Sequence, residues 1–125
     1  MIHLNPQYEA IFNHNNIDQD CDRIASLMSV EADFIKEVLD AGLYKQAVTM
    51  YLQLLKSMCE HFVEDEHYCY FDDMYSPEYT MQWIYDSMQK HDIDAESQAL
   101  LNEGHKEILQ SECYEDYGVP SYIDK

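Results

Sequence analysis

Basic residues are scarce in this 125-residue chain, which has 7 lysines and arginines against 25 aspartates and glutamates and a net charge of −18. A chain with this imbalance repels the phosphates of nucleic acids and the anionic head groups of membranes. Direct binding of nucleic acid or of an anionic membrane surface is therefore excluded as its role. The same charge attracts basic partners.

Glycine and proline are also scarce, with three of each, and no segment keeps an alternation of period two. This favours an all-α fold. The length and the 46% of hydrophobic residues suit one domain over residues 1–125 with a real core. We expect a single compact bundle of five or six helices, followed by an irregular acidic tail at 111–125.

The chain lacks a CxxC pair, a secretory leader and any apolar run close to the roughly 20 residues that a membrane span requires. Its four cysteines are Cys21, Cys59, Cys69 and Cys113. We expect them to be reduced thiols, packed mostly as small apolar groups, in a cytoplasmic protein.

Caps and apolar periodicity predict where the helices lie. The expected ranges are 5–14, 18–28, 29–42, 43–61, 76–88 and 94–109. Asn5 and Pro6 open the first range, Ser29 caps the third, Gly42 ends it, and Asp94 caps the last. Gly104 lies inside the last range, where it predicts a close contact with another helix.

The helix at 43–61 is expected to be central, because two apolar stripes run along it and such a helix is covered on more than one side. One stripe holds Ala47, Tyr51, Leu54, Met58 and Phe62, and the other holds Val48, Leu52, Leu55 and Cys59. The helices before it should turn Ile17, Cys21, Ile24, Leu27, Met28, Phe34, Ile35, Val38 and Leu39 inward.

The segment "AGLYKQAVTMYLQLLKSM" (41–58) resembles the second half of a tetratricopeptide repeat. Gly42, Tyr44, Ala47 and Tyr51 fall where that family places its glycine, aromatic, small and aromatic residues. No second copy follows at the period of the family. The resemblance implies a TPR-like helical hairpin and a role in binding a peptide or protein.

Residues 22–42 have the spacing of a helix-turn-helix, with Ile24, Val30 and Ile35 in its core pattern. A DNA reader needs basic or amide side chains on its second helix. Here the second helix carries Glu31 and Glu37 instead. We therefore interpret the pattern as packing between helices.

The stretch "HFVEDEHYCYFDDMYSPEY" (61–79) has the residue types of a metal site. Glu64 and His67 form an E-x-x-H pair, as in di-iron bundles, but the sequence has no second pair. His61 and Asp65, one turn apart, suit a single zinc or manganese ion. We expect no metal and no cofactor; a metal-binding helical protein that uses His61, Glu64 and His67 is one alternative.

Catalytic patterns are weak. Asp72 and Asp73 are adjacent, so on a helix they point in different directions, and the carboxylates around Cys69 disfavour a thiolate. No glycine-rich phosphate loop and no G-x-S-x-G motif occurs. For His3, His14, His91 and His105 we expect surface or core roles. We predict that the protein is not an enzyme.

The charge pattern itself remains to be explained. No lysine or arginine occurs between Ser57 and Gln89, and tyrosines are interleaved with the acids of this run. Unopposed acids cost stability by self-repulsion, while tyrosine supplies rigid contact area. The predicted partner-binding residues are Glu60, Glu64, Asp65, Glu66, Asp72, Asp73, Tyr75, Glu78, Tyr79 and Asp86.

These features predict a protein that binds a basic, nucleic-acid-handling partner, such as a nuclease, by mimicking nucleic acid. In size, charge and helicity the chain is similar to the small acidic phage and mobile-element proteins that block restriction or CRISPR nucleases. A TPR-like helical scaffold that binds a peptide or protein is the other alternative.

Overall fold

The computed structural model describes residues 2–12, 17–65 and 77–110. They form five helices: α1 (Pro6–Phe12), α2 (Ile17–Asp40), α3 (Tyr44–Asp65), α4 (Pro77–Lys90) and α5 (Ala95–Leu109). No strand occurs in these ranges, so the all-α prediction is confirmed. The expected irregular tail, 111–125, lies outside the described residues.

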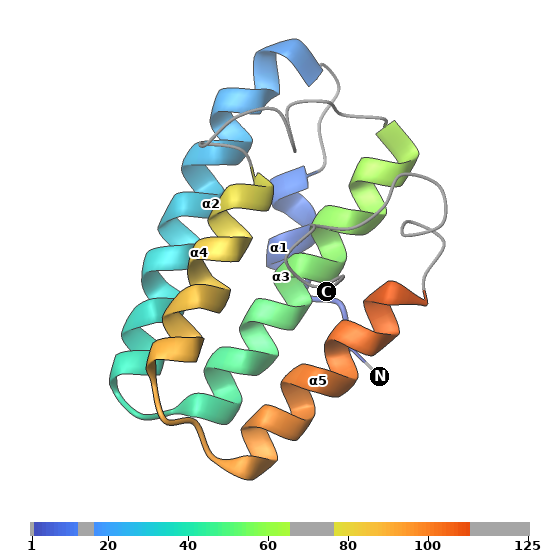
Figure 1. The fold of residues 1–125 in the computed structure, drawn as a ribbon. Coiled ribbons are helices and arrows are strands. Elements are labelled where there is room, and N and C mark those ends of the chain that lie inside the picture. Colours follow the sequence, from blue (N-terminus) through green and yellow to red (C-terminus); the bar gives the residue numbers. More distant parts are fainter. Residues whose placement is uncertain (1, 13–16, 66–76, 111–125) are drawn as a thin grey trace.

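Helix α3 is the centre of the bundle, as predicted. It packs against α1, α2, α4 and α5, and in Figure 1 it runs between the α2–α4 pair and α5. Every described residue of its two expected stripes is buried, from Ala47 to Cys59. The side chain of Phe62 lies outside the described part of the chain.

Helix α2 is unbroken, which corrects the prediction of two helices divided at Ser29. The break is missing because one buried stripe continues through this point, and its members are Ile24, Met28, Ala32, Ile35 and Leu39. Ser29 is exposed and caps nothing, and no glycine or proline lies within α2. The turn that a helix-turn-helix requires is therefore absent from residues 22–40.

Two residues expected in the core lie on the surface instead. Leu27 is 38% exposed and Phe34 is 51% exposed. With a break assumed at Ser29, the inward face was assigned separately to the residues before it and to those after it. The continuous helix has one inward face, and Leu27 and Phe34 lie beside it.

The turn between α2 and α3 depends on Gly42, which has a φ of 85°. The amide of Gly42 donates to the Leu39 carbonyl at 3.0 Å, and the amide of Leu43 donates to the Val38 carbonyl at 3.2 Å. These two hydrogen bonds define a Schellman motif, in which glycine takes the left-handed position without strain. The predicted helix end at Gly42 is confirmed.

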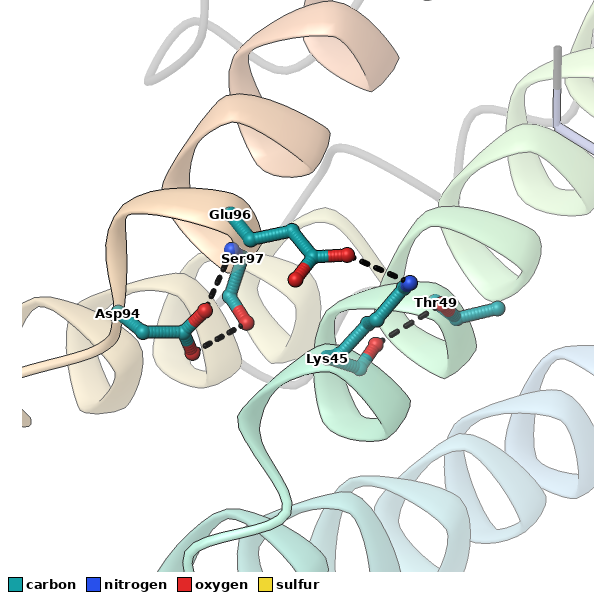
Figure 2. Close-up of polar contacts among 5 residues, drawn as sticks. All are labelled: Lys45, Thr49, Asp94, Glu96 and Ser97. Atoms are coloured by element: carbon teal, nitrogen blue, oxygen red, sulfur yellow. Dashed lines mark hydrogen bonds and ion pairs between the residues drawn. The ribbon is translucent and has the colours of Figure 1, made fainter.

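The start of α5 is capped as expected. Asp94 accepts hydrogen bonds from the Ser97 amide at 3.1 Å and from the Ser97 hydroxyl at 2.7 Å, as Figure 2 shows. These bonds hold the pKa of Asp94 below its usual range. The cap fixes where α5 begins and so sets which of its residues face α3.

Gly104 of α5 lies directly against Leu52 of α3. A β-carbon at position 104 would overlap the two Cδ atoms of Leu52, and Leu52 is buried. The close helix contact predicted from this glycine is confirmed.

Gly104→Val should lower the free energy of unfolding by about 1–3 kcal/mol, because the added methyl groups overpack the contact with Leu52. Ala99→Val is the matched control, since Ala99 is exposed on the same helix and the change there costs at most about 0.7 kcal/mol. Urea denaturation measures both. Equal losses in the two variants would show that the α3–α5 contact accommodates the larger side chain, and would contradict the prediction.

Candidate partner-binding surface

The acids are distributed unevenly along the chain. Three stretches, 13–22, 61–78 and 111–125, contain just over half of the 25 acids but only one of the 7 bases, Lys125. Their acids are Asp18, Asp20, Asp22, Glu64, Asp65, Glu66, Asp72, Asp73, Glu78, Glu112, Glu115, Asp116 and Asp124. The excess charge is therefore concentrated outside the middle of the helices.

The topology brings the helix ends that carry the first two of these stretches toward one end of the bundle. In Figure 1, α2 begins and α3 ends at the upper end, and α4 begins in the upper half, whereas α5 ends at about mid-height on the right. We call the upper end the acidic end. Of its acids, Asp18, Asp20 and Asp22 lie in the first turns of α2, Glu64 and Asp65 in the last turn of α3, and Glu78 in the first turn of α4.

Helix stabilisation does not account for the acids on α3. The carboxyl end of a helix carries partial negative charge, so an acid there costs about 0.3–1 kcal/mol. The last turn of α3 holds Glu64 and Asp65 and no base. The two acids therefore destabilise the end of α3, where a lysine would stabilise it.

The predicted partner-binding residues fall into three groups. Glu60, Tyr79 and Asp86 are described with their side chains: Glu60 is partly buried and interacts with a neighbour, whereas Tyr79 and Asp86 are exposed. Glu64, Asp65 and Glu78 are placed only by the backbone of their helices. Glu66, Asp72, Asp73 and Tyr75 lie outside the described residues.

One face of α4 combines aromatic and charged side chains. Tyr79 and Trp83, one turn apart, are 50% and 38% exposed. The ammonium group of Lys36 on α2 lies 5.3 Å from the centre of the Trp83 ring, a cation–π contact. The run 57–89 contains no lysine or arginine, but the fold places Lys36 of α2 beside it. Local sequence does not reveal this contact.

Metal binding finds no support among the residues that the structure describes. No group of three His, Cys, Asp or Glu side chains in them is placed to hold an ion. The side chains of His61, Glu64 and His67 are outside this set, as are Cys21, Cys69 and Cys113. Cys59 is a buried free thiol packed among apolar residues.

A second feature is a cleft of about 590 Å³ between α3 and α5. Its lining includes the apolar residues Ile2, Leu52 and Leu100 and the bases Lys45 and Lys106. Lys45 pairs with Glu96 at 2.8 Å, and the Thr49 hydroxyl donates to the Lys45 carbonyl at 2.8 Å (Figure 2). The hydrogen bond from Lys45 to Glu96 raises the pKa of this lysine.

Residues near the amino terminus close one side of this cleft. The Ile2 amide donates to both carboxylate oxygens of Glu107, at 3.0 and 3.2 Å. Lys56 donates to the Ile2 carbonyl at 3.2 Å and to Glu107 at 3.1 Å. Burial raises the pKa of Glu107, but the bonds from Lys56 and Ile2 outweigh burial and leave it below its usual range.

A partly buried polar pair joins α3 to α5 beside the core. The Tyr51 hydroxyl and Nε2 of His105 are 2.8 Å apart, and the rings of His105 and Tyr85 lie with centroids 5.3 Å apart. Burial lowers the pKa of His105 to about 4. Sequence reasoning expected a surface or core role for His105 but did not find its partner, because the two residues are 54 positions apart.

No family model, no curated protein and no solved structure matches this chain. In the described part of the chain, no helix has both the length and the apolar character needed to cross a membrane.

Proposed function

We propose that this protein is a non-enzymatic interaction module whose acidic end binds a basic, nucleic-acid-handling protein and occupies its phosphate-binding groove. One observation carries the proposal: the start of α2, the end of α3 and the start of α4 lie toward one end of the bundle, and the stretches 13–22 and 61–78 that they carry hold acids and no base. Carboxylates on helix ends at one pole of a small bundle form a compact anionic surface. A groove that grips a phosphate backbone attracts such a surface.

Aromatic residues beside the acids supply the second half of the interface. Charge attraction speeds association, but it adds little to residence time unless contact area is buried as well. Exposed Tyr79 and Trp83 on α4 provide large, rigid apolar area next to the acidic end. Their position one turn apart lets both contact the same partner.

Charge reversal within the acid-rich stretch 61–78 should abolish partner binding. In the triple variant, Glu64, Asp72 and Asp73 become lysine. In the control, the exposed residues Asp33, Asp92 and Glu103 become lysine. The two variants have the same net charge, so a difference between them reports position and not total charge. Immobilised protein is used to capture partners from a lysate of the native host, and mass spectrometry identifies them. Equal capture by both variants would contradict a localised surface.

Competition tests the mimicry itself. Double-stranded DNA should release the captured partner, and excess protein should displace DNA from the purified partner. Both effects should weaken as salt is raised, because the Debye length shortens from about 10 Å at 0.1 M to about 3 Å at 1 M. If the partner binds the protein and DNA at the same time, with unchanged affinity for each, mimicry is contradicted and a plain scaffold role takes its place.

The α3–α5 cleft favours a second candidate, a TPR-like scaffold that binds a peptide. Lys45, Thr49 and Leu52, which lie within the TPR-like segment 41–58, line this cleft with apolar, hydroxyl and basic groups. Peptide binding here should be lost in Leu100→Glu and should change little with salt. The acidic-end proposal requires the opposite behaviour in both respects.

A further inference from the structure

Helix α2 has an exposed apolar stripe in addition to its buried one. Leu27, Val30 and Phe34 are 38%, 63% and 51% exposed. They follow one another at intervals of three and four residues, which is the spacing of a coiled-coil seam. Three large apolar side chains together on one solvent-facing stripe indicate a contact surface, whereas single ones are ordinary.

Charged residues continue the stripe at both ends with the same spacing. Arg23 lies four residues before Leu27, and Glu37 lies three residues after Phe34. At 100° per residue, the five side chains fall within an arc of about 80° on the helix surface. The stripe therefore runs from a base, through three apolar residues, to an acid.

This stripe is self-complementary about Val30, since Arg23 lies seven residues before it and Glu37 seven residues after it. If two copies of α2 lie antiparallel with a two-fold axis at Val30, each Arg23 meets the other copy's Glu37. Leu27 of each copy then lies beside Phe34 of the other. Within one helix Arg23 and Glu37 are separated by about 21 Å, so they do not pair with each other.

We propose that the protein forms a two-fold symmetric dimer in which α2 pairs antiparallel with α2 of a second copy through Leu27, Val30 and Phe34. A parallel pair is disfavoured, because Arg23 would face Arg23 and Glu37 would face Glu37. Helix α2 forms one edge of the bundle in Figure 1, where a second molecule can approach. The antiparallel arrangement also points the two acidic ends in opposite directions, which limits repulsion between the chains.

The expected affinity is modest. Stable protein interfaces bury about 800 Å² on each partner, and one helix stripe supplies less than this. The high negative charge of each chain opposes association further. We therefore expect a dissociation constant on the order of 100 μM, about −5.5 kcal/mol, at physiological salt.

Sedimentation equilibrium of the full chain, over roughly 10 μM to 1 mM around that expected constant, should show a monomer–dimer equilibrium. Val30→Glu should weaken the dimer at least about tenfold. Leu43→Glu is the matched control, because Leu43 is 53% exposed but lies outside the stripe. A chain that stays monomeric throughout this range would overturn the proposal, and so would equal weakening by the two variants.

Charge exchange identifies the antiparallel register. Arg23→Glu alone and Glu37→Arg alone should each lose the dimer, because like charges then face one another. An equimolar mixture of the two variants should form a heterodimer, since both contacts between positions 23 and 37 then join an acid on one chain to a base on the other. The double variant should self-associate again. Mixing does not repair a fault within a monomer, so a mixture that stays monomeric contradicts this register.

Discussion

Replacing Leu54 by alanine should lower the free energy of unfolding by about 2–5 kcal/mol. Leu54 is completely buried in α3, the helix that contacts all four others. The truncation removes three carbon atoms from this core and leaves a cavity that surrounding helices close only in part. Because α3 is held on several sides, its neighbours have little freedom to collapse into the space.

Urea denaturation followed by circular dichroism measures this loss. Leu43→Ala is the matched control: it removes the same atoms from a side chain that is 53% exposed, so its effect should stay within about 0.5 kcal/mol. A loss of less than about 1 kcal/mol in Leu54→Ala, below the usual cost of such a truncation, would show that α3 is not the packing centre.

Acidification should destabilise the protein through His105. Burial lowers the folded-state pKa of His105 to about 4, against about 6.5 for an unfolded histidine. Above pH 6.5 the ring is neutral in both states, and its contribution to stability is fully present. Between pH 6.5 and pH 4 only the unfolded state binds the proton, so this contribution is lost as the pH falls.

The expected loss is about 2–3 kcal/mol, because one pKa unit corresponds to 1.36 kcal/mol and the partial exposure of His105 reduces the full shift. His105→Gln keeps a polar group near the Tyr51 hydroxyl but does not titrate. The difference in unfolding free energy between the native chain and this variant should therefore change between pH 7.5 and pH 4.5. Protonation of carboxylates affects both chains alike and cancels in the comparison.

A proton NMR titration of the His105 ring gives an independent measurement. Its midpoint should lie well below the ordinary histidine value. A midpoint near 6.5, or a stability difference that does not change with pH, would show that burial does not control this group.

Much of the fold could be predicted from local signals. The two stripes of α3, the cap at Asp94, the turn at Gly42 and the close contact at Gly104 each depend on residues near in sequence or on a residue type with one dominant structural use. Periodicity fails when the assumed boundaries are wrong. Ser29 has the chemistry of a cap, but the apolar stripe on both sides of it keeps one phase, and burial of that stripe determines the helix.

The candidate sites were less predictable, because their geometry depends on contacts between distant parts of the chain. Lys36 lies over Trp83 from another helix, and Tyr51 meets His105 across the α3–α5 packing. No spacing rule connects such pairs. The acid-rich stretches were visible as composition, whereas the common position of the helix ends that carry 13–22 and 61–78 follows only from the up-and-down course of the helices.

The unopposed acids at the end of α3 make the fold sensitive to ionic strength. Glu64 and Asp65 lie in the last turn of α3 with no base, where they repel the partial negative charge of the helix terminus. Added salt screens this repulsion, because the Debye length shortens from about 10 Å at 0.1 M to about 3 Å at 1 M. This helix end is therefore more stable at high salt, whereas a helix end held by surface ion pairs becomes less stable.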